Sequence, residues 1–148
     1  MIEPIRLEFV VACPADHAFD VWTGRIDQWW PADHTVSAEA DLTVVLEGRP
    51  GGRIFERTAA GAEHDWGEVT AWEPPTRLGY QWHLRRDRAD ATDVEIRFVP
   101  LEGTRTRVEI EHRGWERLGA GGETWRDRNR GGWATLLPHF VEAASRGR

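Results

Sequence analysis

The side chains of this chain that could do chemistry are few and widely separated. Its six histidines stand at positions 17, 34, 64, 83, 112 and 139, and no pair has the HExxH spacing or another recognised metal-binding pattern. His64 and Asp65 are adjacent, but neighbouring residues on a strand point to opposite faces and are poorly placed to share a proton. The sequence therefore predicts no metal ion, no cofactor and no catalytic residue that its spacing alone identifies.

The single cysteine, Cys13, directly precedes Pro14 and has no basic neighbour in sequence that would stabilise a thiolate. We expect a buried or inert thiol rather than a nucleophile. One cysteine also excludes an internal disulfide, so the fold must rest on its hydrophobic core.

Charge and hydropathy exclude two classes of partner. The chain has 148 residues and a formal net charge of -6, and its 19 basic residues, all arginine, are scattered among 25 acidic ones. This pattern lacks the continuous basic stripe that nucleic-acid binding requires. Since no apolar run approaches the ~20 residues of a membrane span, we also expect no membrane association. The prediction is one cytoplasmic domain covering residues 1–148.

The first part of the chain predicts a strand and two short helices. Residues 5–11 alternate, with Leu7, Phe9 and Val11 on one face. Pro14 suits the first turn of an amphipathic helix over residues 14–22, which Gly24 ends. A second helix over residues 25–30 would stop at Pro31.

The middle of the chain predicts six further strands separated by turns. The expected ranges are 42–47, 53–57, 65–73, 78–84, 93–99 and 105–112. In the last two strands, apolar residues alternate with charged ones, which indicates a sheet that is covered on one side only.

The C-terminal segment, residues 123–146, predicts a long amphipathic helix that covers this sheet. Pro138 lies inside it and deletes a backbone hydrogen bond, so we expect a kink near residues 134–138. Gly119, Gly121 and Gly122 come before the helix and follow no strand, as a dinucleotide fingerprint would require. They are better suited to a mobile loop at the entrance of a cavity.

The order strand, two short helices, six strands and a long helix resembles the SRPBCC, or START/birch-pollen-allergen, superfamily. Within it, the chain resembles the branch related to the activator of heat-shock-protein ATPase, the AHSA-like proteins. The matching residues are Ala18-Phe19-Asp20-Val21-Trp22-Thr23, Trp29-Trp30-Pro31, Gly51-Gly52-Arg53, Trp66-Gly67-Glu68-Val69, Glu73-Pro74-Pro75, Leu78 and Gly132-Trp133. The resemblance implies an α+β helix-grip fold, in which the last helix closes a cavity against a curved antiparallel sheet.

Such a cavity would hold a small, largely apolar or aromatic molecule by a few polar groups. Its expected wall consists of aromatic residues, with His112 and Asn129 as polar members: Trp30, Phe55, Trp66, Tyr80, Trp82, Trp133 and Phe140. Simple core packing is the alternative for each of these rings, and for His112 a hydrogen-bonded core position is favoured over a general base. A shift of one residue in strand register would exchange the inward and outward sets. Of Trp29 and Trp30, one is expected to be exposed.

Three functions are compatible with this resemblance. The first is a ligand-binding protein without a cofactor. The second is a polyketide cyclase or aromatase-like enzyme, whose available polar groups would be Glu68, Gln81, His83, Arg97, His112 and Asn129. The third is an interaction module resembling the chaperone-ATPase activator, which an exposed apolar patch around Trp29 or Trp115 would favour. A homodimer is compatible with the surplus of tryptophans.

Overall fold

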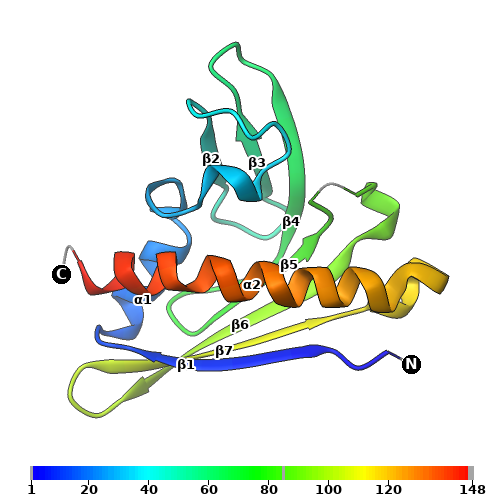
Figure 1. Cartoon of the computed structure of the whole chain (residues 1–148). Helices are drawn as coiled ribbons and strands as arrows, with labels where there is room; N and C mark the ends of the chain where they lie inside the picture. Colours follow the sequence, from blue (N-terminus) through cyan, green and yellow to red (C-terminus); the bar gives the residue numbers. More distant parts are fainter. Residues whose placement is uncertain (1, 85, 147–148) are drawn as a thin grey trace.

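The computed structural model describes residues 2–84 and 86–146 and consists of a curved antiparallel sheet with one long helix across it (Figure 1). The strand order is β1-β7-β6-β5-β4-β3-β2, and every neighbouring pair is antiparallel. The seven strands are β1 (Ile5–Val11), β2 (Thr43–Leu46), β3 (Arg53–Arg57), β4 (Glu63–Glu73), β5 (Arg77–Trp82), β6 (Thr92–Leu101) and β7 (Arg105–Arg113). This is the α+β helix-grip arrangement.

Alternation along the strands decides which face of the sheet is covered. In the register of β1, β6 and β7, Phe9 pairs with Val108, and Val108 pairs with Phe98 on its other side. These residues face the helix side, and Phe98 and Val108 are buried. The opposite face carries charged pairs such as Arg6 with Glu111 and Arg97 with Glu95. The sheet is therefore covered on one side, as its sequence pattern predicts.

A helix and two 3₁₀ turns connect β1 to β2. Helix α1 (Ala15–Trp22) buries Phe19 and Trp22, and the Thr23 hydroxyl donates to the Phe19 carbonyl at its end. The second helix expected over residues 25–30 is instead the 3₁₀ turn η1 (Ile26–Gln28), followed by η2 (Ala32–His34). Pro31 separates these two turns because it cannot continue the first one.

Helix α2 (Gly122–Ser145) runs across the concave face and buries Trp133, Leu136, Phe140 and Ala144. The kink expected near residues 134–138 does not interrupt it: α2 is continuous through Pro138 (Figure 1). Both Pro138 and Ala134, whose carbonyl loses its partner, are exposed. Water can therefore donate a hydrogen bond to the Ala134 carbonyl oxygen, and the buried face of the helix is undisturbed.

Glycines 119, 121 and 122 lie in the 3₁₀ segment η4 (Trp115–Gly121) and at the first position of α2. Gly119 is exposed and interrupts η4 with a positive φ of 63°. A Cβ at Gly122 would overlap the Trp115 carbonyl oxygen and the Ile2 side chain, so this junction is tightly packed. A third short turn, η3 (Arg88–Asp90), lies between β5 and β6.

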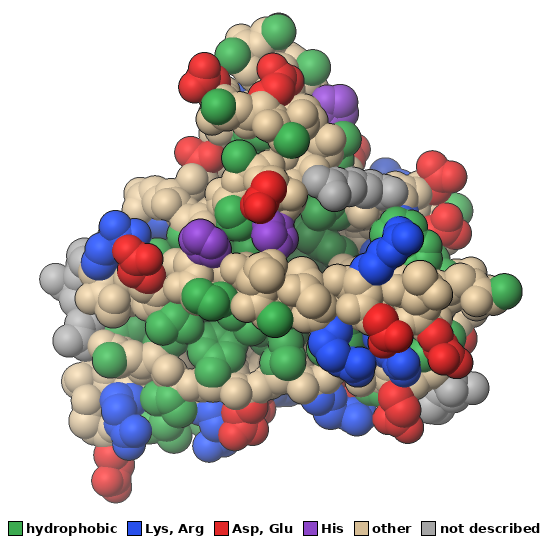
Figure 2. All heavy atoms as spheres, viewed as in Figure 1, with side chains coloured by type: hydrophobic (Ala, Val, Ile, Leu, Met, Phe, Trp, Pro, Cys, Tyr) green, Lys and Arg blue, Asp and Glu red, His purple; other side chains and the backbone are tan. Residues whose placement is uncertain are grey.

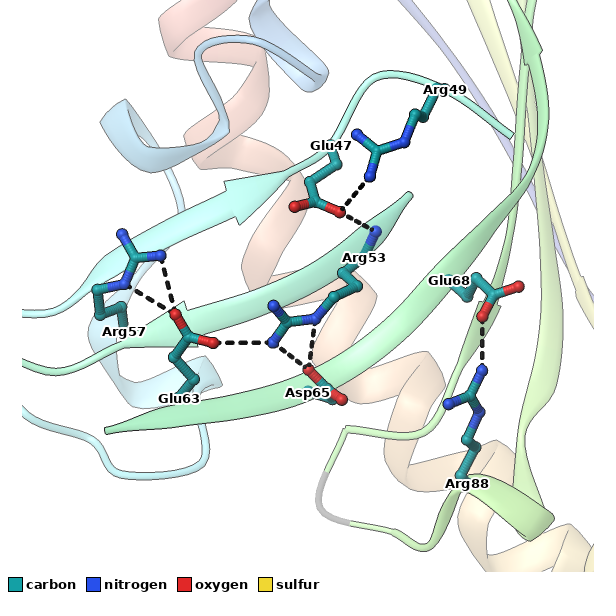
Figure 3. A network of polar contacts seen from close by, with 8 residues as sticks. All are labelled: Glu47, Arg49, Arg53, Arg57, Glu63, Asp65, Glu68 and Arg88. Carbon is teal, nitrogen blue, oxygen red and sulfur yellow. Dashed lines mark hydrogen bonds and ion pairs between the residues drawn. The ribbon is translucent and has the colours of Figure 1, made fainter. Parts of the chain in front are cut away.

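Strand β3 shows where the register departs from expectation. A bulge against β4 lies between Ile54 and Phe55, and both Ile54 and Glu56 are buried on the inner side. Phe55 therefore faces outward, where the guanidinium carbons of Arg53 and Arg57 lie 4.1 and 5.4 Å from its ring centre. These arginines belong to the network of ion pairs in Figure 3. The expectation that Phe55 lines the internal cavity is wrong.

Within residues 2–84 and 86–146, no helix combines the length and the apolar character that crossing a membrane would require.

Candidate functional site

A pocket of about 310 Å³ lies between α2, the η1–η2 segment and the end of β5. In Figure 2 it corresponds to the recess above α2. Apolar side chains dominate its wall and four polar side chains stand at its rim; the lining residues are Trp30, Asp33, His34, Trp82, Leu84, Trp125, Arg128, Asn129, Gly132, Trp133 and Leu136. Four indoles from three different parts of the chain thus surround one cavity.

The indoles on the sheet side of the pocket support one another. The ring centre of Trp30 lies 5.7 Å from that of Trp82 and 5.0 Å from that of Trp66, and Trp66 lies 5.8 Å from Trp82. These distances are typical of favourable aromatic pairs. Trp30 is fixed further because its indole N–H donates to the His34 carbonyl at 2.9 Å. The aromatic wall is therefore built before any ligand arrives.

Trp133 is held from behind by His112, which is fully buried. The Trp133 indole N–H donates to His112 Nδ1 at 3.1 Å, and His112 Nε2 lies 2.7 Å from the Thr92 hydroxyl. An indole N–H can only donate, so Nδ1 must be the acceptor and Nε2 must carry the proton. Burial, with a smaller contribution from the positive charge of Arg86, holds the pKa of His112 well below its usual range. His112 is therefore a neutral core residue that positions Trp133.

Arg86 continues this chain of contacts towards Trp82. Its guanidinium donates to the Trp82 carbonyl at 2.8 Å and to the Thr92 hydroxyl at 3.1 Å, and it also binds the Asp90 carbonyl. Burial lowers the pKa of Arg86 to about 10, which the charge of Asp90 partly opposes. Arg86 remains a cation at neutral pH and fixes the β5–β6 connection beside the pocket.

Asp33 and His34 form a pair at the rim that our sequence analysis missed. His34 Nδ1 lies 2.8 Å from Asp33 Oδ1, and His34 Nε2 lies 2.8 Å from the hydroxyl of Thr135 on α2. The hydrogen bond to His34, followed by the positive charge of this ring, lowers the pKa of Asp33. This arrangement links η2 to α2 across the pocket entrance. Its sequence signal, adjacent Asp and His, becomes informative only because a 3₁₀ turn brings the two side chains together.

Glu56 is a second residue that sequence reasoning missed. Its carboxylate is fully buried and accepts hydrogen bonds from Val36 N at 2.6 Å, Ser37 N at 2.9 Å and Trp66 Nε1 at 2.8 Å. Burial raises the pKa of Glu56, but these hydrogen bonds outweigh burial, and the net pKa is lowered. The spacing of Glu56 from Ile54 by two residues was the available signal, since it places both on the inner face.

The residues expected to form the cavity wall fall into three groups. Trp30, Trp82, Asn129 and Trp133 line the pocket. Trp66, Tyr80 and His112 lie one layer behind it, each against one of these indoles. Phe140 does not reach it and packs instead against Phe9, Trp22 and Trp29, while Phe55 faces the outer side.

The expectation that Trp29 or Trp30 is exposed is wrong. Trp29 is buried, with its indole N–H donating to the Val21 carbonyl at 2.7 Å, while Trp30 is half-buried in the pocket. Both rings point inward because the 3₁₀ turn ends before them. Trp115 is also buried, and its N–H donates to the His112 carbonyl. An exposed apolar patch around Trp29 or Trp115 is therefore absent from the described residues.

Of the polar groups considered for a cyclase, only Asn129 lines the pocket. Arg97 lies on the outer face with Glu95, and Glu68 pairs with Arg88. Among residues 2–84 and 86–146, no group of three or more histidine, cysteine or acidic side chains is arranged to hold a metal ion.

Comparison with known proteins places this arrangement in a family. A family model described as activator of Hsp90 ATPase homolog 1-like protein matches residues 12–145. The chain belongs to this family. No curated protein matches.

Solved structures with the same fold differ widely in what they do. Txn09, an anthrahydroquino-γ-pyrone synthase, is 34% identical over 83% of this chain and 84% of its own, with a TM-score of 0.60. CalC, a self-sacrificing resistance protein from Micromonospora echinospora, is 23% identical over 97% and 92%, with a TM-score of 0.67. An Hsp90 activator from Plasmodium falciparum is 16% identical over 95% and 94%, with a TM-score of 0.68. The last two likenesses concern the fold alone.

Proposed function

We propose that this protein binds a small planar aromatic molecule of polyketide type in the pocket between α2 and β5. The observation that carries the proposal is the convergence of Trp30, Trp82, Trp125 and Trp133 on one cavity. Flat indole faces favour flat ligands, and each stacked aromatic pair contributes ~0.5–1.5 kcal/mol beyond the burial of its area. The polar rim then orients the ligand.

The size of the pocket supports a ligand of a few fused rings. Its volume of about 310 Å³ lies near the lower end of the roughly 300–1,000 Å³ typical of small-molecule sites. The similarity to a synthase of an anthrahydroquino-γ-pyrone points to the same class of compact oxygenated ring system.

A cyclase is the second candidate, and the same relative favours it, because that protein is a synthase. In this chain the group best placed to move a proton is His34, which Asp33 orients through Nδ1 at the pocket rim. General acid–base catalysis needs such an oriented imidazole within reach of the substrate. The hydroxyl of Thr135, which now contacts Nε2, would have to yield this atom to the substrate.

Activation of a chaperone ATPase is less well supported. It rests on the family description and on a structural likeness of 16% identity, while the tryptophans that would mark a docking patch are buried.

A fluorescence titration with a panel of hydroxyanthraquinones tests the proposal. Saturable quenching is expected in the wild type and in the control Trp72→Phe, since Trp72 packs on Phe19 and does not line the pocket. Trp30→Leu should weaken binding by roughly tenfold, because it removes one stacking face. Unsaturable quenching, or equal affinity of Trp30→Leu and wild type, would refute it. Mass spectrometry of the released compound then separates a binder, which returns it unchanged, from an enzyme.

A further inference from the structure

We infer that the pocket selects planar ligands that carry an ionised oxygen, a phenolate, enolate or carboxylate, and that Arg128 binds this oxygen. The inference rests on the proposed function and names the ligand class more narrowly. It starts from a contrast between Arg128 and most of the other arginines of the surface.

Most of the other described arginines of this acidic protein form ion pairs with carboxylates; Arg86, Arg105 and Arg146 do not, and none of these three lines the pocket. Figure 3 shows Arg53 with Glu63 and Asp65, Arg57 with Glu63, and Arg88 with Glu68, at distances of 2.6 to 3.0 Å. Outside the figure, Arg6, Arg77, Arg107, Arg113 and Arg117 are paired in the same way.

The same holds for the two arginines that flank Arg128 on helix α2. Arg126 and Arg130 both contact Asp127, at 3.2 and 3.3 Å. Arg128 stands between them in sequence, faces the pocket, and has no carboxylate within ion-pair distance among the residues that the structure describes. Its guanidinium carbon lies 5.3 Å from the ring centre of Trp125, which also lines the pocket. A cation held against an indole is oriented without being neutralised.

The other charged groups at the pocket do not cancel this cation. Asp33 is the one acidic residue among the lining side chains and is directed at His34 Nδ1. Arg86 lies 5.4 Å from Trp125, and its guanidinium is committed to the carbonyls of Trp82 and Asp90. Arg128 is therefore the cation of the pocket lining that no described carboxylate contacts within ion-pair distance.

A guanidinium is suited to an oxyanion because its N–H groups donate in one plane. Charge-assisted hydrogen bonds of this kind are about twice as strong as neutral ones. An aromatic ring stacked on Trp30 and Trp82 with its acidic oxygen at the rim would satisfy both parts of the site.

Two probes of the same shape and different charge test the inference: anthraquinone-2-carboxylate and its neutral primary amide. Calorimetric titration of the wild type should give a ratio of affinities of about ten in favour of the carboxylate. Arg128→Gln should bring this ratio close to one by weakening only the carboxylate, and Arg128→Lys should retain part of it. The control Arg130→Gln, two residues away and facing Asp127, should leave the ratio unchanged.

Equal affinity of both probes for the wild type, or an unchanged ratio in Arg128→Gln, would overturn the inference. The proposed binding of planar aromatic molecules in the pocket would be unaffected. Binding of neither probe would overturn the proposed function and the inference with it. Thermal unfolding of each variant checks that Arg128→Gln remains folded, which its exposed position leads us to expect.

Discussion

His112 illustrates how a single buried residue determines the position of a pocket wall. It accepts the indole N–H of Trp133 and donates to Thr92, so that α2, β7 and β6 are joined by one imidazole. Protonation of Nδ1 would place two donors face to face and would charge a fully buried ring. The neutral form is therefore the one that the fold selects.

A dependence of stability on pH follows from this selection. The pKa of His112 in the folded protein lies well below its usual range, whereas the unfolded chain should titrate near ~6.5. Below pH ~6.5 the unfolded state binds more protons at this residue than the folded state does. The contribution of neutral His112 to stability is therefore fully present above pH ~6.5 and is lost as the pH falls. We expect the free energy of unfolding of the wild type, relative to His112→Gln, to fall by up to ~1.4 kcal/mol per pH unit below pH ~6.5. Denaturant titrations between pH 5 and 8 measure it, and parallel curves for the two proteins would contradict it.

A second prediction concerns the buried carboxylate of Glu56, which accepts two backbone N–H groups and the Trp66 indole. Glu56→Gln puts an amide donor where only acceptors fit, so we expect a loss of roughly 2–4 kcal/mol in unfolding free energy. Glu102→Gln, in the exposed turn between β6 and β7, should change it by less than ~0.5 kcal/mol. Urea denaturation compares the two, and similar losses would argue against a structural role of the carboxylate.

At the scale of elements, the hydrogen bond between His34 and Thr135 joins η2 to α2 over the pocket. Thr135→Val removes the hydroxyl while keeping the shape of the side chain. We expect amide hydrogen exchange to become several-fold faster in residues 30–36, because local opening of this segment would no longer require the His34–Thr135 hydrogen bond to break. Exchange in β6 and β7 should stay as it is.

Thr135→Ser is the matched control, since it retains the hydroxyl and should exchange at the wild-type rate. If Thr135→Val also exchanges at that rate, the contact does not restrain the segment.

Gly67 constrains the pairing of β4 with β5. A Cβ at this position would overlap the Gln81 carbonyl oxygen of the neighbouring strand. Gly67→Ala should force the strands apart and cost ~1–3 kcal/mol in unfolding free energy. Gly103→Ala is the control, because a Cβ at this position would overlap no neighbouring atom, although the positive φ of 72° at Gly103 adds some strain. Thermal melts that leave Gly67→Ala as stable as the wild type would contradict the close approach.

The order of elements was predictable from the sequence because alternation and turn residues determine it locally. The expected strands over residues 53–57 and 105–112 agree with β3 and β7 to within a residue. Side-chain direction was less predictable wherever the register is irregular. The bulge between β3 and β4 leaves Trp66 of β4 without a partner in the ladder, whereas the outward direction of Phe55 follows from its alternation with Ile54 and Glu56.

The candidate site was predictable only in part, for the same physical reason. Trp30, Trp82 and Trp133 were expected at a cavity and line the pocket. Asp33, His34 and Arg128 were not predicted as site residues, because they come from a 3₁₀ turn and from the polar flank of a helix. Their proximity depends on how the η1–η2 segment packs against α2, which local patterns do not encode.

For the whole molecule, the burial of Trp29 and Trp115 removes the argument for association that the number of tryptophans suggested. The exposed large hydrophobic residues of the described chain are Val10, Val36 and Val141. The hydrophobic side chains that Figure 2 shows below α2 are flanked by red and blue ones. We therefore expect a monomer of 16.9 kDa at micromolar concentration. Sedimentation velocity should show one slow boundary. A faster boundary that grows with protein concentration would instead support a homodimer.

The indoles of this protein form a continuous path from Trp66 through Trp30, Trp29 and Trp22 to Trp133, with successive ring centres 5.0 to 6.1 Å apart. Rings this close do not behave as independent chromophores. Excitation absorbed by Trp22, deep in the core, can migrate to Trp30 at the pocket before it is emitted. A single absorbing ligand in the pocket should then quench the fluorescence of tryptophans that it does not contact. Occupancy of the pocket should therefore lower most of the tryptophan fluorescence of the protein.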